Sequence, residues 1–156
     1  MHTHSCVRVL AVLIILGAAL FSSRLTAGTY TITTTADDGA GSLRDAITSA
    51  NTILGRDTIL FNLTGNVVHT IRPLTPFPIV TDSLVINGYS QPGSSVNTLA
   101  VGNNARILIQ LDGSLMAGVG SGITIQGGGN SIVRGLVVNR FSSAGIALMS
   151  ANNIAE

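Results

Sequence analysis

The sequence predicts an all-β solenoid, in which short parallel strands stack into coils, closed at its N-terminal end by one short α-helix. Three observations predict this class. After residue 57 the chain alternates short runs rich in β-branched residues with Gly, Asn, Ser or Pro. Similar runs recur 23 residues apart at two places, which is typical of repeating coils. Charged residues make up only 10% of the chain, against about 25% in ordinary proteins, as expected where each coil is mostly core or tight turn.

The first elements after the N-terminal segment are a strand at residues 30–35 and a helix at residues 42–50. The strand alternates Thr with Ile and Tyr, a pattern that favours β structure. Ser42 and Asp45 have the spacing of a capping box, which marks the start of a helix. One helix face is apolar. Because so short a helix is marginal alone, we expect this face to close the end of the strand stack; its residues are Leu43, Ala46, Ile47 and Ala50.

The remaining strands are short, and each is bounded by residues that favour turns. The two repeats pair residues 84–86 with 107–109 and residues 122–125 with 145–148. A sandwich or meander would need a hairpin dipeptide between successive strands, and Asn-Gly occurs once, at residues 87–88. Leucine-rich repeats need a Leu/Asn framework that is absent here. The expected strands are residues 58–63, 67–71, 83–86, 107–111, 123–125, 132–133, 136–138 and 146–148.

The N-terminal segment predicts export. One positive charge lies within residues 1–8, and residues 9–21 form an apolar run of thirteen, which is too short to span a bilayer. A polar stretch and then Ala27-Gly28 follow, so residues 1–27 read as a secretory signal peptide cleaved after Ala27. A buried core helix and a membrane anchor are the alternatives. The predicted organisation is residues 1–27 as signal, 28–57 as strand and capping helix, and 58–156 as coils, with a secreted or cell-surface location.

The composition excludes several functions. All eight basic residues are Arg, without the basic stripe that a nucleic-acid binder needs. Removal of residues 1–27 also removes Cys6 and leaves His69 as the single histidine, which excludes disulfides, a cysteine nucleophile and the usual Cys/His zinc sites. We therefore expect no nucleic-acid partner, no cofactor, no bound metal and no membrane span after signal cleavage.

Three residues are the candidates for polysaccharide-lyase chemistry, in which acidic clusters hold Ca²⁺ and a basic residue removes a proton: Asp112, Arg134 and Arg140. Arg is charged at all ordinary pH values, and Ca²⁺ takes six to eight oxygen ligands, so one Asp is too few. The alternative places Asp112 in a turn and both arginines on the outer surface, and we favour it. No catalytic, cofactor-binding or metal-binding residue is therefore assigned.

Other polar motifs have structural interpretations. Residues 37–39 (Asp-Asp-Gly) lack the ligand spacing of an EF-hand loop and are expected to form a turn before the helix. His69 has no second ligand or acid partner nearby in the sequence, so we expect it to pack or to form one hydrogen bond. The Gly-rich residues 118–122 precede a strand and not a helix, which excludes a phosphate-binding loop.

Several segments together carry a family resemblance. Residues 41–47 (GSLRDAI), which follow a Thr-rich strand, resemble the CSLREA capping segment of bacterial secreted parallel β-helix proteins. Gly replaces the Cys and Asp replaces the Glu of that motif. Residues 86–93 (INGYSQPG), 111–113 (LDG) and 134–141 (RGLVVNRF) are similar to the repeats that follow it in that family. The resemblance covers nearly all of the chain after residue 27 and implies a right-handed β-helix in an exported or surface protein.

Two functions remain open. The first is a non-catalytic exported or cell-surface scaffold, adhesive or polysaccharide-binding, and it is the one that we favour because catalytic groups are missing. The second is the N-terminal part of a carbohydrate-active β-helix enzyme, a polysaccharide lyase or glycoside hydrolase, whose site lies on later coils. Both agree with the expectation that further coils or extracellular modules follow Glu156, since no capping sequence is visible at residues 151–156.

Overall fold

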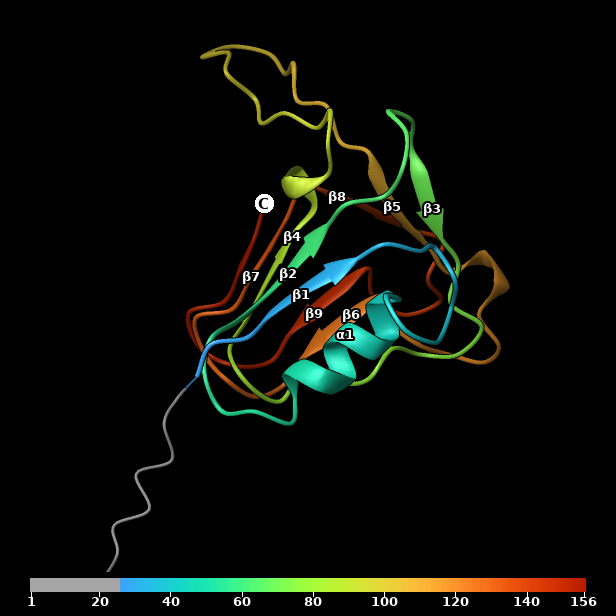
Figure 1. Ribbon diagram of the computed structural model, residues 1–156, viewed down its shortest axis with the longest axis vertical. Coiled ribbons are helices and arrows are strands. Elements are labelled where there is room, and N and C mark those ends of the chain that lie inside the picture. The colour runs from blue at the N-terminus through green and yellow to red at the C-terminus, as the bar shows by residue number, and fades with distance from the viewer. Residues whose placement is uncertain (1–25) are drawn as a thin grey trace, which may run out of the picture.

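The computed structural model describes residues 26–156, and nearly all of the expected signal peptide lies outside them. Strands running side by side form the body, and one helix packs against it (Figure 1). The helix is α1 (Leu43–Ala50), and two 3₁₀ turns follow β4 and β5, at Gly88–Ser90 and Gly113–Leu115. The strands are β1 (Thr29–Ile32), β2 (Asp57–Phe61), β3 (His69–Ile71), β4 (Leu84–Asn87), β5 (Ile109–Asp112), β6 (Ile123–Ile125), β7 (Ile132–Arg134), β8 (Leu136–Asn139), β9 (Ile146–Leu148) and β10 (Ile154–Ala155).

The strands form three sheets, and every strand pair within them is parallel. The first sheet has the order β1-β2-β4-β7-β10, the second β3-β5-β8 and the third β6-β9. From β4 onward the chain passes through the first, second and third sheets in turn, twice, and then returns to the first. Before β4, an isolated parallel bridge from Val80 to Ile125 occupies the corresponding place beside the third sheet. Residues 26–156 are thus mostly parallel β structure with one α-helix.

One of the two predicted repeats corresponds to stacked strands. Ile123 of β6 lies opposite Ile146 of β9, 23 residues later, as the similarity of residues 122–125 and 145–148 indicated. The other repeat, residues 84–86 and 107–109, does not correspond to neighbouring strands, because β4 and β5 belong to different sheets. The neighbour of β4 is instead β7, with Val85 opposite Ile132. A long excursion at residues 91–107 lies between β4 and β5 and shifts the spacing there (Figure 1).

The excursion projects from the body of strands as a loop, drawn in yellow to orange in Figure 1. Its two arms are joined by backbone hydrogen bonds between Ser95 and Arg106 in both directions. The side chain of Asn97 accepts from the Leu99 and Asn104 N–H groups near the tip. Local polar contacts of this kind replace the sheet hydrogen bonds that the segment lacks.

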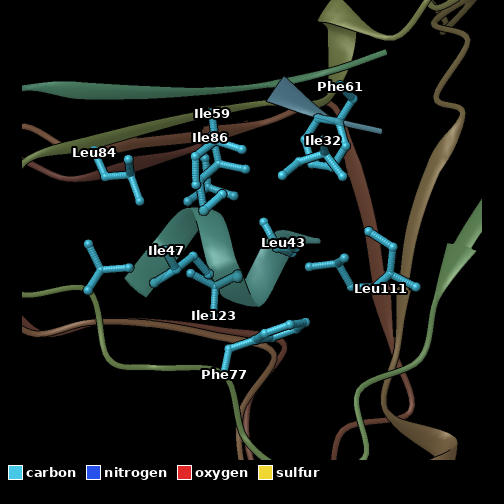
Figure 2. Close-up of a cluster of buried hydrophobic side chains, with 14 of the residues drawn as sticks. Ile32, Leu43, Ile47, Ile59, Phe61, Phe77, Leu84, Ile86, Leu111 and Ile123 are labelled. Carbon is cyan, nitrogen blue, oxygen red and sulfur yellow. The ribbon is translucent and has the colours of Figure 1, made fainter. Parts of the chain in front are cut away.

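The helix begins where the sequence predicted and packs on its apolar face. Ser42 is the N-cap residue, and its side chain accepts from the Asp45 N–H at 3.2 Å. The return half of the predicted capping box is replaced, because the Ser42 N–H donates to the Gly39 carbonyl. The buried residues of α1 are the four predicted: Leu43, Ala46, Ile47 and Ala50. In Figure 2, Leu43 and Ile47 point into a cluster of apolar side chains from several strands, including Ile59 and Ile123.

Several strand boundaries differ from the prediction. The first strand ends at Ile32 and not at residue 35, because the N–H groups of Thr33 and Thr34 turn to the Gly41 carbonyl. The strand expected at residues 67–71 begins only at His69, since Val67 and Val68 are exposed. A short strand at Ile154–Ala155, which the sequence did not predict, pairs with β7.

The core is a single cluster that the inward residues of all three sheets share with α1. Alternate residues of a strand point to opposite faces, and β2 shows this with its first, third and fifth residues buried. Ile86 of the first sheet, Leu111 of the second and Ile125 of the third are all fully buried. Burial of each such side chain contributes about 1.5–3 kcal/mol, so the sheets stabilise one another through this cluster.

Candidate functional site

The outward face of the second sheet carries a row of polar side chains. Inward residues of β3, β5 and β8 join the core, so their neighbours along each strand point outward. Thr70 lies opposite Gln110, and its hydroxyl donates to Gln110 Oε1 at 3.0 Å. The Gln110 amide in turn donates to Asn139 Oδ1 at 3.3 Å. Residues from three strands are thus linked by hydrogen bonds across the sheet.

Asp112 is the centre of this face. It ends β5 opposite Asn139 of β8, and its side chain is only 1% exposed. Arg72, which follows β3, places its Nε 3.1 Å from Asp112 Oδ2. Arg140, which follows β8, places its Nε 3.0 Å from Asp112 Oδ1. One buried carboxylate therefore holds two arginines from the flanking strands.

Local backbone structure fixes the two ends of this arrangement. Asp112 is the N-cap residue of the 3₁₀ turn at Gly113–Leu115, and its Oδ1 accepts from the Ser114 N–H at 3.0 Å. Gly113 packs so closely against the next turn that a Cβ there would lie 2.7 Å from the Arg140 carbonyl oxygen. Arg140 itself has a positive φ of 58°, which turns the chain sharply after β8. These turns set the position of Arg140 beside Asp112.

The environment of Asp112 keeps its side chain ionised. Burial alone raises the pKa of Asp112, because it disfavours the charged form. The hydrogen bonds from Ser114, the charge of Arg140 and the hydrogen bond from Arg72 oppose this effect. Together they outweigh it, and the pKa of Asp112 lies below its ordinary value.

The two arginines keep much of their hydrogen-bonding capacity for a ligand. Their side chains are 49% exposed at Arg72 and 59% exposed at Arg140. Each arginine directs its Nε to Asp112. The Nη1 and Nη2 atoms of both side chains have no hydrogen-bond partner within residues 26–156. A guanidinium group has five N–H donors in a planar fork that matches a carboxylate. With one Asp and two Arg, the cluster has a net charge of +1.

The third candidate for lyase chemistry lies elsewhere. Arg134 ends β7 in the first sheet, where its Nε donates to Asn87 Oδ1 at 3.0 Å. Its Nη1 is 3.9 Å from the Glu156 carboxylate. The structure therefore brings together Asp112 and Arg140 but not Arg134, and the third charged residue of the cluster is Arg72.

Arg72 was not predicted from the sequence. A usable signal existed, because Arg72, Asp112 and Asn139 each come directly after an alternating apolar run. Aligning those runs puts the three residues in one register column, as Ile71, Leu111 and Val138 are aligned in the structure. The 40-residue separation of Arg72 and Asp112 hides the relationship, since the excursion lengthens that interval beyond the 23-residue period.

The remaining motifs have structural surroundings. His69 is half-buried in β3, and its Nε2 lies 3.1 Å from the Gly65 carbonyl oxygen. Residues 37–39 form a bend before the helix, where Asp37 Oδ1 accepts from Arg44 at 2.7 Å and from the Leu74 N–H at 3.2 Å. The Gly-rich residues 118–122 lead into β6, and the Gly122 N–H donates to the Ala144 carbonyl at 2.9 Å.

Some kinds of site are not found in the described part of the chain. Residues 26–156 contain no group of three His, Cys, Asp or Glu side chains placed to hold a metal ion. The same residues enclose no pocket. None of the helical structure described there is long and apolar enough to cross a membrane. The polar face of the second sheet therefore has no pocket among the described residues.

No protein-family model, no curated protein and no solved structure matches this chain.

Proposed function

We propose that the chain is an exported, non-catalytic scaffold with the fold of a right-handed parallel β-helix, which binds acidic polysaccharide on the outward face of its second sheet. The fold proposal is supported by the repeated passage through three parallel sheets and by the seating of α1 on their shared core. The resemblance of residues 41–47 to the CSLREA segment supports two further parts of the proposal, which are the right-handed coil and the relationship to CSLREA-containing secreted proteins. Export is supported by the apolar run at residues 9–21.

One observation carries the binding proposal: Asp112 holds Arg72 and Arg140 side by side on an open sheet face while their outer N–H groups have no partner among the described residues. A sheet face without a pocket suits an extended polymer better than a small molecule, which binds in concave pockets. Uronic acid units carry carboxylates that a guanidinium fork binds in bidentate fashion. The neighbouring side chains of Thr70, Gln110 and Asn139 supply donors and acceptors for sugar hydroxyls.

The test is a binding measurement on the full-length exported protein. We expect it to bind a polyuronate, such as polygalacturonate or alginate, more tightly than a neutral galactan of similar length, with an affinity that falls as salt rises. Replacing both arginines (Arg72→Gln and Arg140→Gln) is expected to weaken polyuronate binding at least tenfold. The matched control is the double variant Arg56→Gln and Arg106→Gln, because it removes the same two positive charges from exposed residues outside the strands of the second sheet.

Two outcomes would overturn the proposal. Equal polyuronate binding by the Arg72/Arg140 double variant and by the Arg56/Arg106 double variant would show that the second-sheet face is not the binding surface. Release of unsaturated sugars from the polyuronate with Ca²⁺ present, followed by ultraviolet absorbance, would contradict a non-catalytic role and favour the enzyme alternative.

A further inference from the structure

A buried carboxylate near the start of the described chain has an unsatisfied oxygen. Asp57, the first residue of β2, is fully buried. Its Oδ1 accepts from the Gly28 N–H at 2.5 Å, whereas its Oδ2 is buried without a hydrogen-bond partner. No ion pair in the described residues includes Asp57. A buried carboxylate needs a pairing cation and hydrogen bonds to both oxygens, so this site lacks a positive group.

Among the described residues, the hydrogen-bond donor to this carboxylate is the backbone nitrogen of Gly28, and its position is closely fixed. The Gly28 carbonyl accepts from the Thr58 N–H at 2.9 Å, which aligns β1 with β2. A Cβ at residue 28 would lie 2.9 Å from the Tyr30 hydroxyl and 3.1 Å from Asp57 Oδ1. Only glycine therefore fits without displacing these groups. The preceding residue, Ala27, is exposed.

The bond between Ala27 and Gly28 is also the expected cleavage site of the signal peptide. We propose that cleavage there makes Gly28 the new N-terminus and that its α-ammonium group docks on Asp57 as a buried ion pair. A signal peptidase would add water across the peptide bond: the C–N bond breaks, the Ala27 carbonyl carbon gains the oxygen as a carboxylate, and the Gly28 nitrogen becomes an amine that takes up a proton. This inference rests on the export proposed above.

Docking would complete the hydrogen bonding of Asp57. A peptide N–H donates once, whereas an ammonium group has three donors, so both carboxylate oxygens gain a partner from one nitrogen that is already in place. The ion pair would also join the first residue of the processed chain to β2. Export would thus add a stabilising contact that the uncleaved chain cannot form.

The titratable groups around Asp57 do not supply the missing cation. Burial, and then the negative charge of Asp57, raise the pKa of the Tyr30 hydroxyl. Tyr30 is therefore neutral at ordinary pH and does not compete for the ammonium. Asp82, before β4, has its oxygens directed to the Gly55 and Ser83 N–H groups. Arg56 is exposed beside Asp57 in sequence.

The test compares two chains that differ by one residue. One begins at Gly28 and the other at Ala27, and both keep every strand and helix of the described structure. At pH 6 we expect the Gly28 chain to melt at least about 4 °C higher. Pairing with Asp57 raises the pKa of the α-amino group on folding. The stabilisation should therefore be complete below the pKa of the α-amino group in the unfolded chain, which is about 8, and be lost as the pH rises through its folded pKa.

Two further chains isolate the ion pair. Acetylation of the Gly28 amine removes its charge but keeps Asp57, and is expected to lower the melting temperature to that of the Ala27 chain. Asp57→Asn should abolish the difference between the Gly28 and Ala27 chains. If Asp57→Asn does not fold, the acetylated chain decides the same question. Equal melting of the Gly28, Ala27 and acetylated chains across the pH range would overturn the docking.

N-terminal sequencing of the exported protein tests the processing step separately. A first residue of Gly28 supports the proposal, and any other first residue overturns it. Retention of an uncleaved chain inside the cell would contradict the export proposed above, whereas the melting comparison would still decide whether a free Gly28 amine binds Asp57.

Discussion

Arg44 and Asp37 form an ion pair that joins the start of α1 to the bend before it, with Arg44 Nη2 2.7 Å from Asp37 Oδ1. The same guanidinium donates to the carbonyl oxygens of Thr75 and Pro76, each at 2.8 Å. It also lies 5.2 Å from the ring centroid of Phe77, within range of a cation–π contact. One side chain thus fastens the helix to a segment more than 30 residues later.

Arg44→Ala is therefore expected to destabilise the protein. The ion pair is partly buried, since Asp37 is 22% exposed and Arg44 15% exposed. Loss of charge-assisted hydrogen bonds at such a site costs about 1.5–3 kcal/mol. Urea unfolding of the variant measures the change in the free energy of unfolding.

Two controls accompany this measurement. Arg56→Ala removes an exposed arginine and should change stability by less than about 0.5 kcal/mol. Arg44→Lys keeps the charge but loses the planar fork, so it should restore only part of the stability. If Arg44→Ala were no less stable than Arg56→Ala, the contacts of Arg44 would contribute nothing net.

Leu43→Asp tests whether α1 closes the core. Leu43 is fully buried among side chains from the strands (Figure 2). An unpaired carboxylate there loses the packing of Leu43 and is desolvated without a partner, so we expect a loss of at least about 3 kcal/mol. Leu54→Asp is the control, because Leu54 is 65% exposed. Equal melting temperatures of the two variants would contradict a structural role for the helix face.

Much of the fold was predictable because it follows from local patterns. Helical spacing correctly identified the four buried residues of α1. The composition of residues 58–63 correctly indicated a strand, although β2 begins at Asp57 and ends at Phe61. The spacing of β6 and β9 was readable because only a short connection separates successive passes of the chain there. The pairing of β4 with β7 was not readable, since the excursion at residues 91–107 has no hydrophobic period that would mark it as an insertion.

The candidate site was less predictable than the fold. Asp112 and Arg140 were singled out, but their contact depends on the register of β5 with β8 and on the positive φ of Arg140. Arg72 was missed because register across 40 residues is set by tertiary packing and not by local sequence. The contact between Gly28 and Asp57 was not predictable for the same reason, since the two residues are 29 positions apart and α1 lies between them in the sequence.

Gly88→Ala is expected to disrupt the close packing of two turns. A Cβ at Gly88 would overlap the backbone carbonyl of Gly135, which leads from β7 into β8. Backbone cannot move aside as a flexible side chain can, so we expect a loss of about 1–3 kcal/mol. Gly145→Ala is a matched control, because its Cβ would first meet a Val138 methyl group at 3.3 Å. In thermal unfolding, Gly88→Ala should have a clearly lower melting temperature than Gly145→Ala.

Asp112→Asn should reduce the loss of stability that the protein shows as the pH falls. The pKa of Asp112 is lowered in the folded protein, since hydrogen bonds and the arginines outweigh the effect of burial. A lowered folded pKa stabilises the protein above the unfolded value, which is 3.8, and the stabilisation is lost as the pH falls through the folded value. Wild type should therefore melt above Asp112→Asn at pH 6, and the gap should narrow below about pH 4. A gap that stays constant from pH 6 to pH 2 would show that ionisation of Asp112 does not hold Arg72 and Arg140 in place.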